Sequence, residues 1–107
     1  WVLLNASQQF DYLNVFSGFR LAWVDATGIA IRNRLGTPTH PIINTAMIGA
    51  FTRMLEMPPL DMIFDAIMED ISVNPEQNIR ASKDAYERVR LLGIVNHRNR
   101  EDTAREK

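Results

Sequence analysis

The sequence predicts an α/β domain whose strands lie early in the chain and whose C-terminal part is rich in helices. Two short continuous apolar runs, residues 1–4 (WVLL) and 21–24 (LAWV), have the pattern of strands covered on both faces. After Gly36 the apolar residues recur every three or four positions, which is typical of amphipathic helices. At 107 residues, the chain is expected to form a single domain.

The strands are joined and followed by segments with clear turn signals. Residues 8–20 are long enough for a crossover connection and carry a Ser17-Gly18 turn signal. The second strand leads into DATG and a short helix expected to end at Gly36. Asp25 or Thr27 is expected to cap this helix, although the end of such a strand is also where ligands and neighbouring chains approach. Residues 36–41 (GTPTHP) are expected to form a loop.

Three helices are predicted in the second half of the chain. The first spans residues 45–56 with Asn44 as its N-cap, and a second follows the Pro58-Pro59 break over residues 60–71. The third is capped by Asn74 and is expected to reach about Leu92. Residues 96–107 hold no large apolar side chain, so we expect one domain over residues 1–93 and a polar tail over 94–107.

Composition narrows the function classes. Lys and Arg total 12 against 13 Asp and Glu, whereas proteins of nucleic acids or membrane surfaces usually carry a basic excess. Apolar runs fall short of the roughly 20 residues of a membrane span, and Cys is absent. We therefore expect a cytoplasmic protein without nucleic-acid or membrane partners. The chain opens on Trp1 directly in an apolar run, which suggests a part of a longer protein.

No catalytic or metal-binding constellation is recognisable. His40 and His97 are far apart, and neither has a second His or paired carboxylate at helical spacing. No Ser lies in a Gly-x-Ser-x-Gly phrase, and no glycine-rich phosphate loop is present. The acidic residues of 60–71 fall mostly on the polar side of their helix. The expectation is therefore no catalytic residue and no metal ligand.

The helix over residues 45–56 has two unlike sides. Its small-residue flank consists of Ala46, Gly49, Ala50 and Arg53, and its bulky flank of Met47, Phe51, Met54 and Leu55. A mid-helix Gly costs roughly 1 kcal/mol relative to Ala, so we expect something to lie close to its backbone.

Two interpretations of the small-residue flank remain open. It packs inside the domain, or it receives another subunit or a long cofactor, with Asn44 and Thr45 donating from the start of the helix. The second interpretation makes Asn44, Thr45, Gly49 and Arg53 candidate interface or ligand-facing residues. Asp25 and Thr27 are further candidates at the end of the second strand.

Several phrases, in this order, resemble the gamma subunit, or equivalent domain, of the 2-oxoacid:ferredoxin oxidoreductases, the pyruvate/ketoisovalerate oxidoreductase family. The phrases are VDATGIAI, LGTP, NTAMIGAF, PPLDMIFDAIMEDI and QNIRASKDAYERV. The likeness covers residues 21–89, and Asn44-Thr45 with Gly49-Ala50 is its most specific part. It implies the C-terminal half of a doubly wound, three-layer αβα domain.

The resemblance also implies a larger assembly that oxidatively decarboxylates a 2-oxoacid such as pyruvate. Its partners would be alpha and beta, and in some enzymes delta, subunits in an oligomer, with ferredoxin or flavodoxin as electron acceptor. Thiamine diphosphate, Mg²⁺ and iron–sulfur clusters would lie mainly on companion subunits, and coenzyme A would accept the acyl group. We expect this chain alone to bind none of these cofactors and to be inactive by itself.

A hypothesis from another class competes with this one. The chain could be a small α/β interaction module that docks a partner through the helix over residues 44–51 and has no redox role. The family hypothesis requires a glycine-rich, strand-first N-terminal half upstream of these residues, and the module hypothesis does not.

Overall fold

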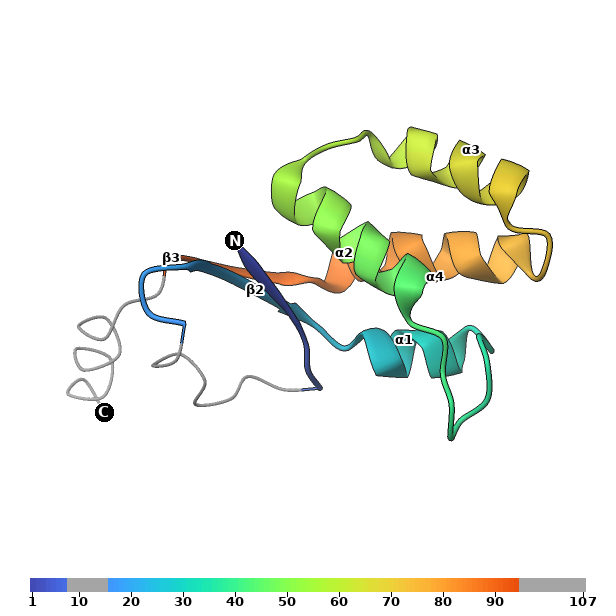
Figure 1. Ribbon diagram of the computed structural model, residues 1–107, viewed down its shortest axis with the longest axis horizontal. Coiled ribbons are helices and arrows are strands. Elements are labelled where there is room, and N and C mark those ends of the chain that lie inside the picture. Colours follow the sequence, from blue (N-terminus) through green and yellow to red (C-terminus); the bar gives the residue numbers. More distant parts are fainter. Residues whose placement is uncertain (8–15, 95–107) are drawn as a thin grey trace.

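A computed structural model describes residues 1–7 and 16–94 (Figure 1). Its elements in chain order are β1 (Val2–Asn5), β2 (Arg20–Val24), α1 (Ala26–Arg32), α2 (Asn44–Leu55), α3 (Leu60–Asp70), α4 (Pro75–Arg88) and β3 (Arg90–Ile94). The predicted α/β class with a helix-rich C-terminal part is confirmed. Across the described ranges, no helix combines the length and apolar character that crossing a membrane requires.

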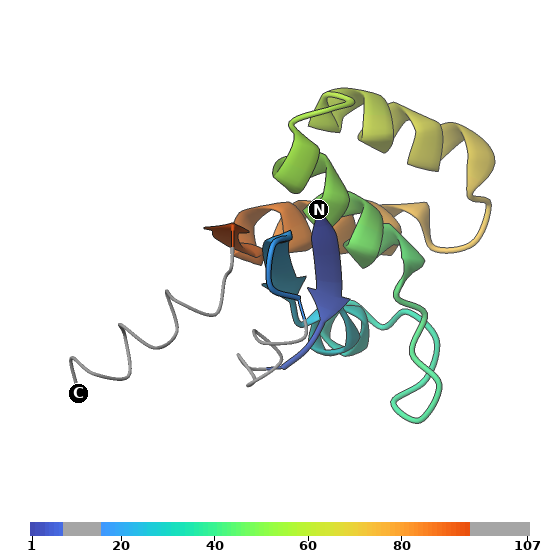
Figure 2. The same cartoon turned by 60° about the vertical axis from the view of Figure 1, so that its left-hand side comes forward.

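The three strands form one sheet with β2 in its centre (Figure 2). β1 runs parallel to β2, with Val2 opposite Leu21, and β3 runs antiparallel to β2. Leu21 and Ala22 are both buried. Because neighbouring strand residues point to opposite faces, β2 is covered on both faces, as predicted. The residues of β1 are at most partly buried, so the first apolar run lacks the cover expected for it.

β3 corrects the prediction for the end of the third helix. That helix was expected to reach about Leu92, but α4 ends at Arg88 and Val89 already has the extended angles φ −60° and ψ 137°. The following residues pair with β2, which satisfies backbone groups that a frayed helix end would leave to water. β3 reaches Ile94, one residue beyond the expected domain boundary. The rest of the predicted polar tail, residues 95–107, lies outside the described residues.

The predicted helix caps are partly confirmed. Asp25 is the N-cap of α1, and its carboxylate accepts a hydrogen bond from the amide of Gly28. Asn44 is the first residue of α2 instead of its N-cap, which is Ile43 and makes no side-chain capping bond. Asn74 does precede α4, but its side chain makes no capping bond. Its φ of 52° lies in the left-handed region, where Asn is one of the better tolerated residues.

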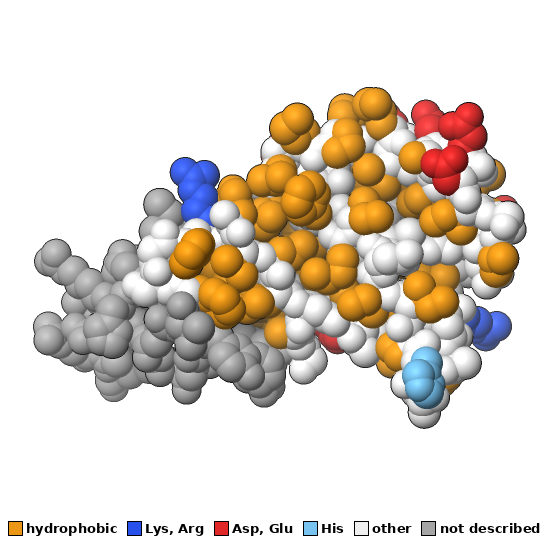
Figure 3. All heavy atoms as spheres, in the orientation of Figure 1, with side chains coloured by type: hydrophobic (Ala, Val, Ile, Leu, Met, Phe, Trp, Pro, Cys, Tyr) orange, Lys and Arg blue, Asp and Glu red, His pale blue; other side chains and the backbone are white. Residues whose placement is uncertain are grey.

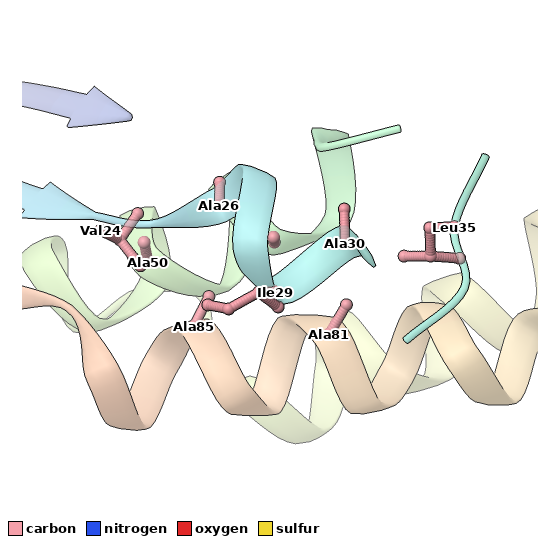
Figure 4. Close-up of a cluster of buried hydrophobic side chains, with 9 residues drawn as sticks. Val24, Ala26, Ile29, Ala30, Leu35, Ala50, Ala81 and Ala85 are labelled. Carbon is pink, nitrogen blue, oxygen red and sulfur yellow. The ribbon is translucent and has the colours of Figure 1, made fainter. Parts of the chain in front are cut away.

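The core lies where α2, α4, α1 and the end of β2 meet. These helices contact one another, and α2 also contacts β1 and β2. Figure 4 shows most of this cluster, in which small side chains predominate. Its buried members are Val24, Ala26, Ile29, Ala30, Leu35, Ala46, Ala50, Ala81 and Ala85. Since Ala side chains are short, the backbones of these elements approach closely.

α3 lies apart from this core, along α4 and the end of α2 (Figure 1). Its predicted inward face is only partly buried. Ile67 is its one buried residue, whereas Met68, which was expected on the same face, is 57% exposed. A second helical layer on the far side of the sheet, which a complete three-layer domain has, is not part of residues 1–7 and 16–94.

Candidate interface around helix α2

The small-residue flank of α2 is occupied by α4 of the same chain. Thr45 Oγ1 donates a hydrogen bond of 2.8 Å to Asn78 Oδ1, and one turn later Gly49 lies against Ser82. Both pairs are separated by 33 residues. The two helices therefore advance side by side in the same direction, and contacts at one turn are followed by contacts at the next.

Gly49 is required by how closely these helices approach. A Cβ built on Gly49 would lie 2.6 Å from the carbonyl carbon of Ser82 and 2.8 Å from its Cα. These are backbone atoms, so no side-chain rotation could relieve the overlap. The close packing of the two backbones at Gly49 thus offsets the unfavourable helix propensity of glycine. Of the two interpretations of this flank, packing inside the domain is what the structure shows at Gly49.

A buried chain of hydrogen bonds closes the first turns of both helices. Thr45 and Asn78 are 1% and 6% exposed. Asn78 Oδ1 accepts the hydrogen bond from Thr45, and Asn78 Nδ2 donates a hydrogen bond of 2.8 Å to the backbone oxygen of Asn74. Each polar group has a partner, so the low dielectric of the interior strengthens this network. Thr45 is therefore a structural residue of the contact between α2 and α4.

Arg53 lies at the other end of the same contact. Its guanidinium forms an ion pair with Glu56 and lies 5.8 Å from the centroid of the Tyr86 ring. The Tyr86 hydroxyl approaches Glu56 Oε2 at 3.5 Å. The Arg53 side chain is 42% exposed, and water screens an ion pair at such a site. Arg53, Glu56 and Tyr86 therefore connect the ends of α2 and α4, and the charge of Arg53 stays accessible at the surface.

Asp25 and Thr27 organise the start of α1. Asp25 Oδ1 accepts from the amide of Gly28 at 2.9 Å, and Thr27 Oγ1 accepts from Asn5 Nδ2 at 3.0 Å. Asn5 Oδ1 in turn accepts from the amide of Ala26 at 3.0 Å. The predicted capping role of Asp25 is confirmed. The sequence analysis did not identify Asn5 as a site residue. A signal was present, because Asn5 is a polar residue at the end of an apolar strand, where the ends of neighbouring parallel strands meet.

The candidate residues fall into two groups. Thr45, Gly49 and Arg53 belong to the contact with α4. Asp25 and Thr27 belong to the start of α1. Within residues 1–7 and 16–94, no hydrogen bond joins the two groups. Asn44 is exposed, and its Oδ1 accepts from the amide of Thr45 at 2.8 Å. A role of these six residues toward a partner subunit or ligand stays a prediction.

The outward face of α2 is apolar. Ile48, Phe51 and Leu55, here called the outer stripe, are spaced three and four residues apart and are 42%, 45% and 37% exposed. Figure 3 shows hydrophobic side chains gathered over this part of the molecule and continuing onto α3. One of the two interpretations of the sequence placed a partner on the small-residue flank. The exposed apolar surface instead includes Phe51 and Leu55 of the bulky flank.

The described residues do not fit a metal site, and the sequence offers no thiolate for an iron–sulfur cluster. Within the described ranges no three His, Asp or Glu side chains group so that they could hold a metal ion, and the sequence contains no Cys to ligate a cluster. We therefore derive no reaction step through a thiamine diphosphate–magnesium or iron–sulfur group on this chain.

Comparison with known proteins gives a consistent relationship. No protein-family model matches the chain. It is 34% identical over 93 residues to pyruvate synthase subunit PorC of Methanothermobacter marburgensis, an alignment covering 86% of this chain and 48% of that subunit. It is 38% identical over 76 residues to the pyruvate/ketoisovalerate oxidoreductases common subunit gamma of Pyrococcus furiosus. That alignment covers 70% of this chain and 39% of the Pyrococcus subunit.

A solved structure agrees with these relatives. The crystal structure of pyruvate oxidoreductase subunit PORC from Thermotoga maritima superposes with a TM-score of 0.69 at 30% identity, over 82% of this chain and 49% of that one. The chain is homologous to one half of these gamma-type subunits. The resemblance seen in the sequence is thus confirmed, and the chain spans about half the length of the gamma-type subunits that it matches.

Proposed function

We propose that the chain is part of a gamma-type subunit of a 2-oxoacid:ferredoxin oxidoreductase. In this role it supports the coenzyme A-dependent oxidative decarboxylation of a 2-oxoacid such as pyruvate without carrying a redox cofactor. The support is the homology to subunits named for pyruvate synthase and for pyruvate/ketoisovalerate oxidoreductases. The likeness to a subunit crystal structure supports it independently.

The observation that carries the proposal is the contact between α2 and α4. Two of the five phrases that carry the family resemblance lie on these two helices: NTAMIGAF, which holds its most specific part, and QNIRASKDAYERV. They meet through the Thr45–Asn78 hydrogen bond and the close approach of Gly49 to Ser82. These residues hold two helices of this chain together, which supports a structural role for this part of the subunit.

The proposal places the chemistry on companion subunits. Alpha and beta, and in some assemblies delta, subunits would hold thiamine diphosphate, Mg²⁺ and the iron–sulfur clusters, and ferredoxin or flavodoxin would receive the electrons in the cytoplasm. Coenzyme A would reach the assembly near the gamma-type subunit, where Asn44 is an exposed polar side chain. No catalytic residue is assigned to this chain.

Purification of the native assembly tests this proposal. An affinity-tagged copy of the chain, expressed in its natural host, should co-purify in fixed ratio with oxidoreductase subunits identified by mass spectrometry. The preparation should reduce ferredoxin when a 2-oxoacid and coenzyme A are both supplied, and a panel of 2-oxoacids identifies the substrate. Recovery of the tagged chain without any oxidoreductase subunit would contradict the proposal.

The outer stripe favours a second candidate function. An interaction module that docks a partner through α2 would also expose Ile48 and Phe51 at the surface. In that case the tagged chain would recover a partner unrelated to oxidoreductases, and the purified complex would show no electron transfer from any 2-oxoacid.

A further inference from the structure

Helix α2 carries large apolar side chains on its outer face. Its inner side is buried against α4 and the sheet, yet the outer stripe of Ile48, Phe51 and Leu55 faces outward with more than a third of each residue exposed. A surface helix normally presents polar residues to water, and a helix that is apolar all round is normally buried. The outer stripe is therefore a surface that a further element would cover.

The edge of the sheet next to α2 is also open. In the order β1-β2-β3, β1 has β2 as its neighbour on one side, and no strand among residues 1–7 and 16–94 pairs with its other side. Leu3 of β1 and Met47 of α2 pack against the same core. The free edge of β1 thus lies beside α2 (Figure 2), so one packed body could cover the free edge and the outer stripe together.

We infer that the outer stripe and the free edge of β1 bind the other half of the gamma-type subunit, meaning the part of the relatives that this chain does not match. The inference rests on the proposed function. The matched region is 48% of the M. marburgensis subunit and 49% of the T. maritima structure, so a gamma-type subunit contains about as much chain again. That remaining chain is of the size needed to supply both a strand for β1 and apolar cover for α2.

The strand direction favours this occupant over a second copy of the chain. β1 and β2 are parallel, and parallel strands are usually interior strands covered on both faces. A two-fold symmetric pair would set one β1 antiparallel to the other, because the symmetry reverses the strand direction. A strand from a different segment can continue the parallel arrangement.

Complementation in solution tests the inference. The chain is co-expressed with a polypeptide comprising the half of the M. marburgensis subunit that it does not match, and the product is analysed by size-exclusion chromatography with light scattering. We expect a one-to-one complex. Hydrogen exchange of the amides of Val2–Asn5 and of α2 should slow at least tenfold in this complex relative to the chain alone.

Matched variants locate the contact. Phe51→Asp places a charge in the outer stripe and should weaken association at least tenfold. Val73→Asp introduces the same charge at a residue that is 69% exposed and outside the stripe, and it should associate as the original chain does. Circular dichroism of both variants checks that their helices are retained.

Several outcomes overturn the inference. The first two are a symmetric pair of this chain that excludes the added half, and no association with that half at all. The others are equally tight association by the Phe51→Asp variant and the original chain, and hydrogen exchange at β1 and α2 that is unchanged by the added half. These readouts do not involve turnover, so a failure of the inference is distinguished from a failure of the proposed function. A one-to-one complex supports the inference even where the tagged chain recovers no oxidoreductase subunit from its host.

Discussion

Two threonines of α2 are buried with opposite hydrogen-bonding outcomes. Thr45 donates to Asn78, whereas the hydroxyl of Thr52 is buried with no partner among the residues that the structure describes. Both residues are 1% exposed. A buried polar group without a partner loses its bond to water and gains nothing in return. The same substitution should therefore lower stability at Thr45 and should not lower it at Thr52.

The first prediction compares Thr45→Val with Thr52→Val. Thr45→Val leaves Asn78 Oδ1 buried without its donor and should lower the free energy of unfolding by about 1–3 kcal/mol. Thr52→Val removes an unpaired hydroxyl and should leave stability unchanged or raise it by about 1 kcal/mol. Urea denaturation followed by circular dichroism measures both. Equal losses in the two variants would show that the Thr45–Asn78 bond contributes nothing specific.

Gly49 gives the second prediction at this scale. Because its Cα faces the backbone of Ser82, Gly49→Leu should force α2 and α4 apart and cost about 3 kcal/mol or more, despite the better helix propensity of Leu. Ala66→Leu adds a Leu at an exposed position of α3 and should change stability by less than about 0.5 kcal/mol. Denaturant unfolding of both variants measures the difference. A Gly49→Leu chain as stable as the original would mean that the flank is open to the outside.

At the scale of single elements, the starts of α1 and α2 are built differently. α1 has a side-chain cap from Asp25 and a further tie from Asn5 at the end of β1. α2 begins without a side-chain cap, and its start is held by the Thr45–Asn78 bond. One helix is thus fixed by local capping and the other by tertiary contact.

The third prediction follows from this difference. Asp25→Ala removes the acceptor for the Gly28 amide and should cost about 1 kcal/mol of stability. Asn44 is not the N-cap of α2, and Asn44→Ala removes only the bond that its exposed side chain accepts from the amide of Thr45. It should cost less than about 0.5 kcal/mol. Thermal or urea unfolding of the two variants measures the contrast. A larger loss at Asn44 than at Asp25 would restore Asn44 as the N-cap of α2.

At the scale of the whole molecule, β3 returns the chain to the sheet, at the edge opposite β1. It follows α4 directly and pairs antiparallel with β2. The antiparallel pairing of the last strand with the middle strand therefore connects the helical part of the chain to its N-terminal strands. Removing β3 should weaken the connection between these parts, which α2 also maintains through its contacts with β1 and β2.

The fourth prediction uses two truncations. A chain ending at Val89 lacks β3 and should lose at least about 2 kcal/mol of stability, because several ladder hydrogen bonds of about 1 kcal/mol each disappear with it. A chain ending at Ile94 keeps β3 and should unfold within about 0.5 kcal/mol of the original. Denaturant titration of both chains measures this. If the chain ending at Val89 unfolds as cooperatively, and at the same denaturant concentration, as the chain ending at Ile94, β3 does not contribute to the stability of the fold.

The sequence by itself determined the features that depend on local chemistry. Periodicity and turn residues located the two parallel strands and α1 to α3, and Asp25 indicated the cap of α1. The small side chains of α2 indicated a close approach by something, and the order of five phrases led to the gamma-type subunits that comparison confirmed.

Only the tertiary structure decided what approaches each face. The identity of the neighbour at Gly49 depends on Ser82, 33 residues away, and no periodicity specifies such a pairing. Residues 90–92 continue a helical pattern locally, but pairing with β2 makes them a strand, since a long-range ladder outweighs a weak local preference. The outer stripe became recognisable for the same reason: which apolar side chains of α2 face outward is fixed by where α4 packs.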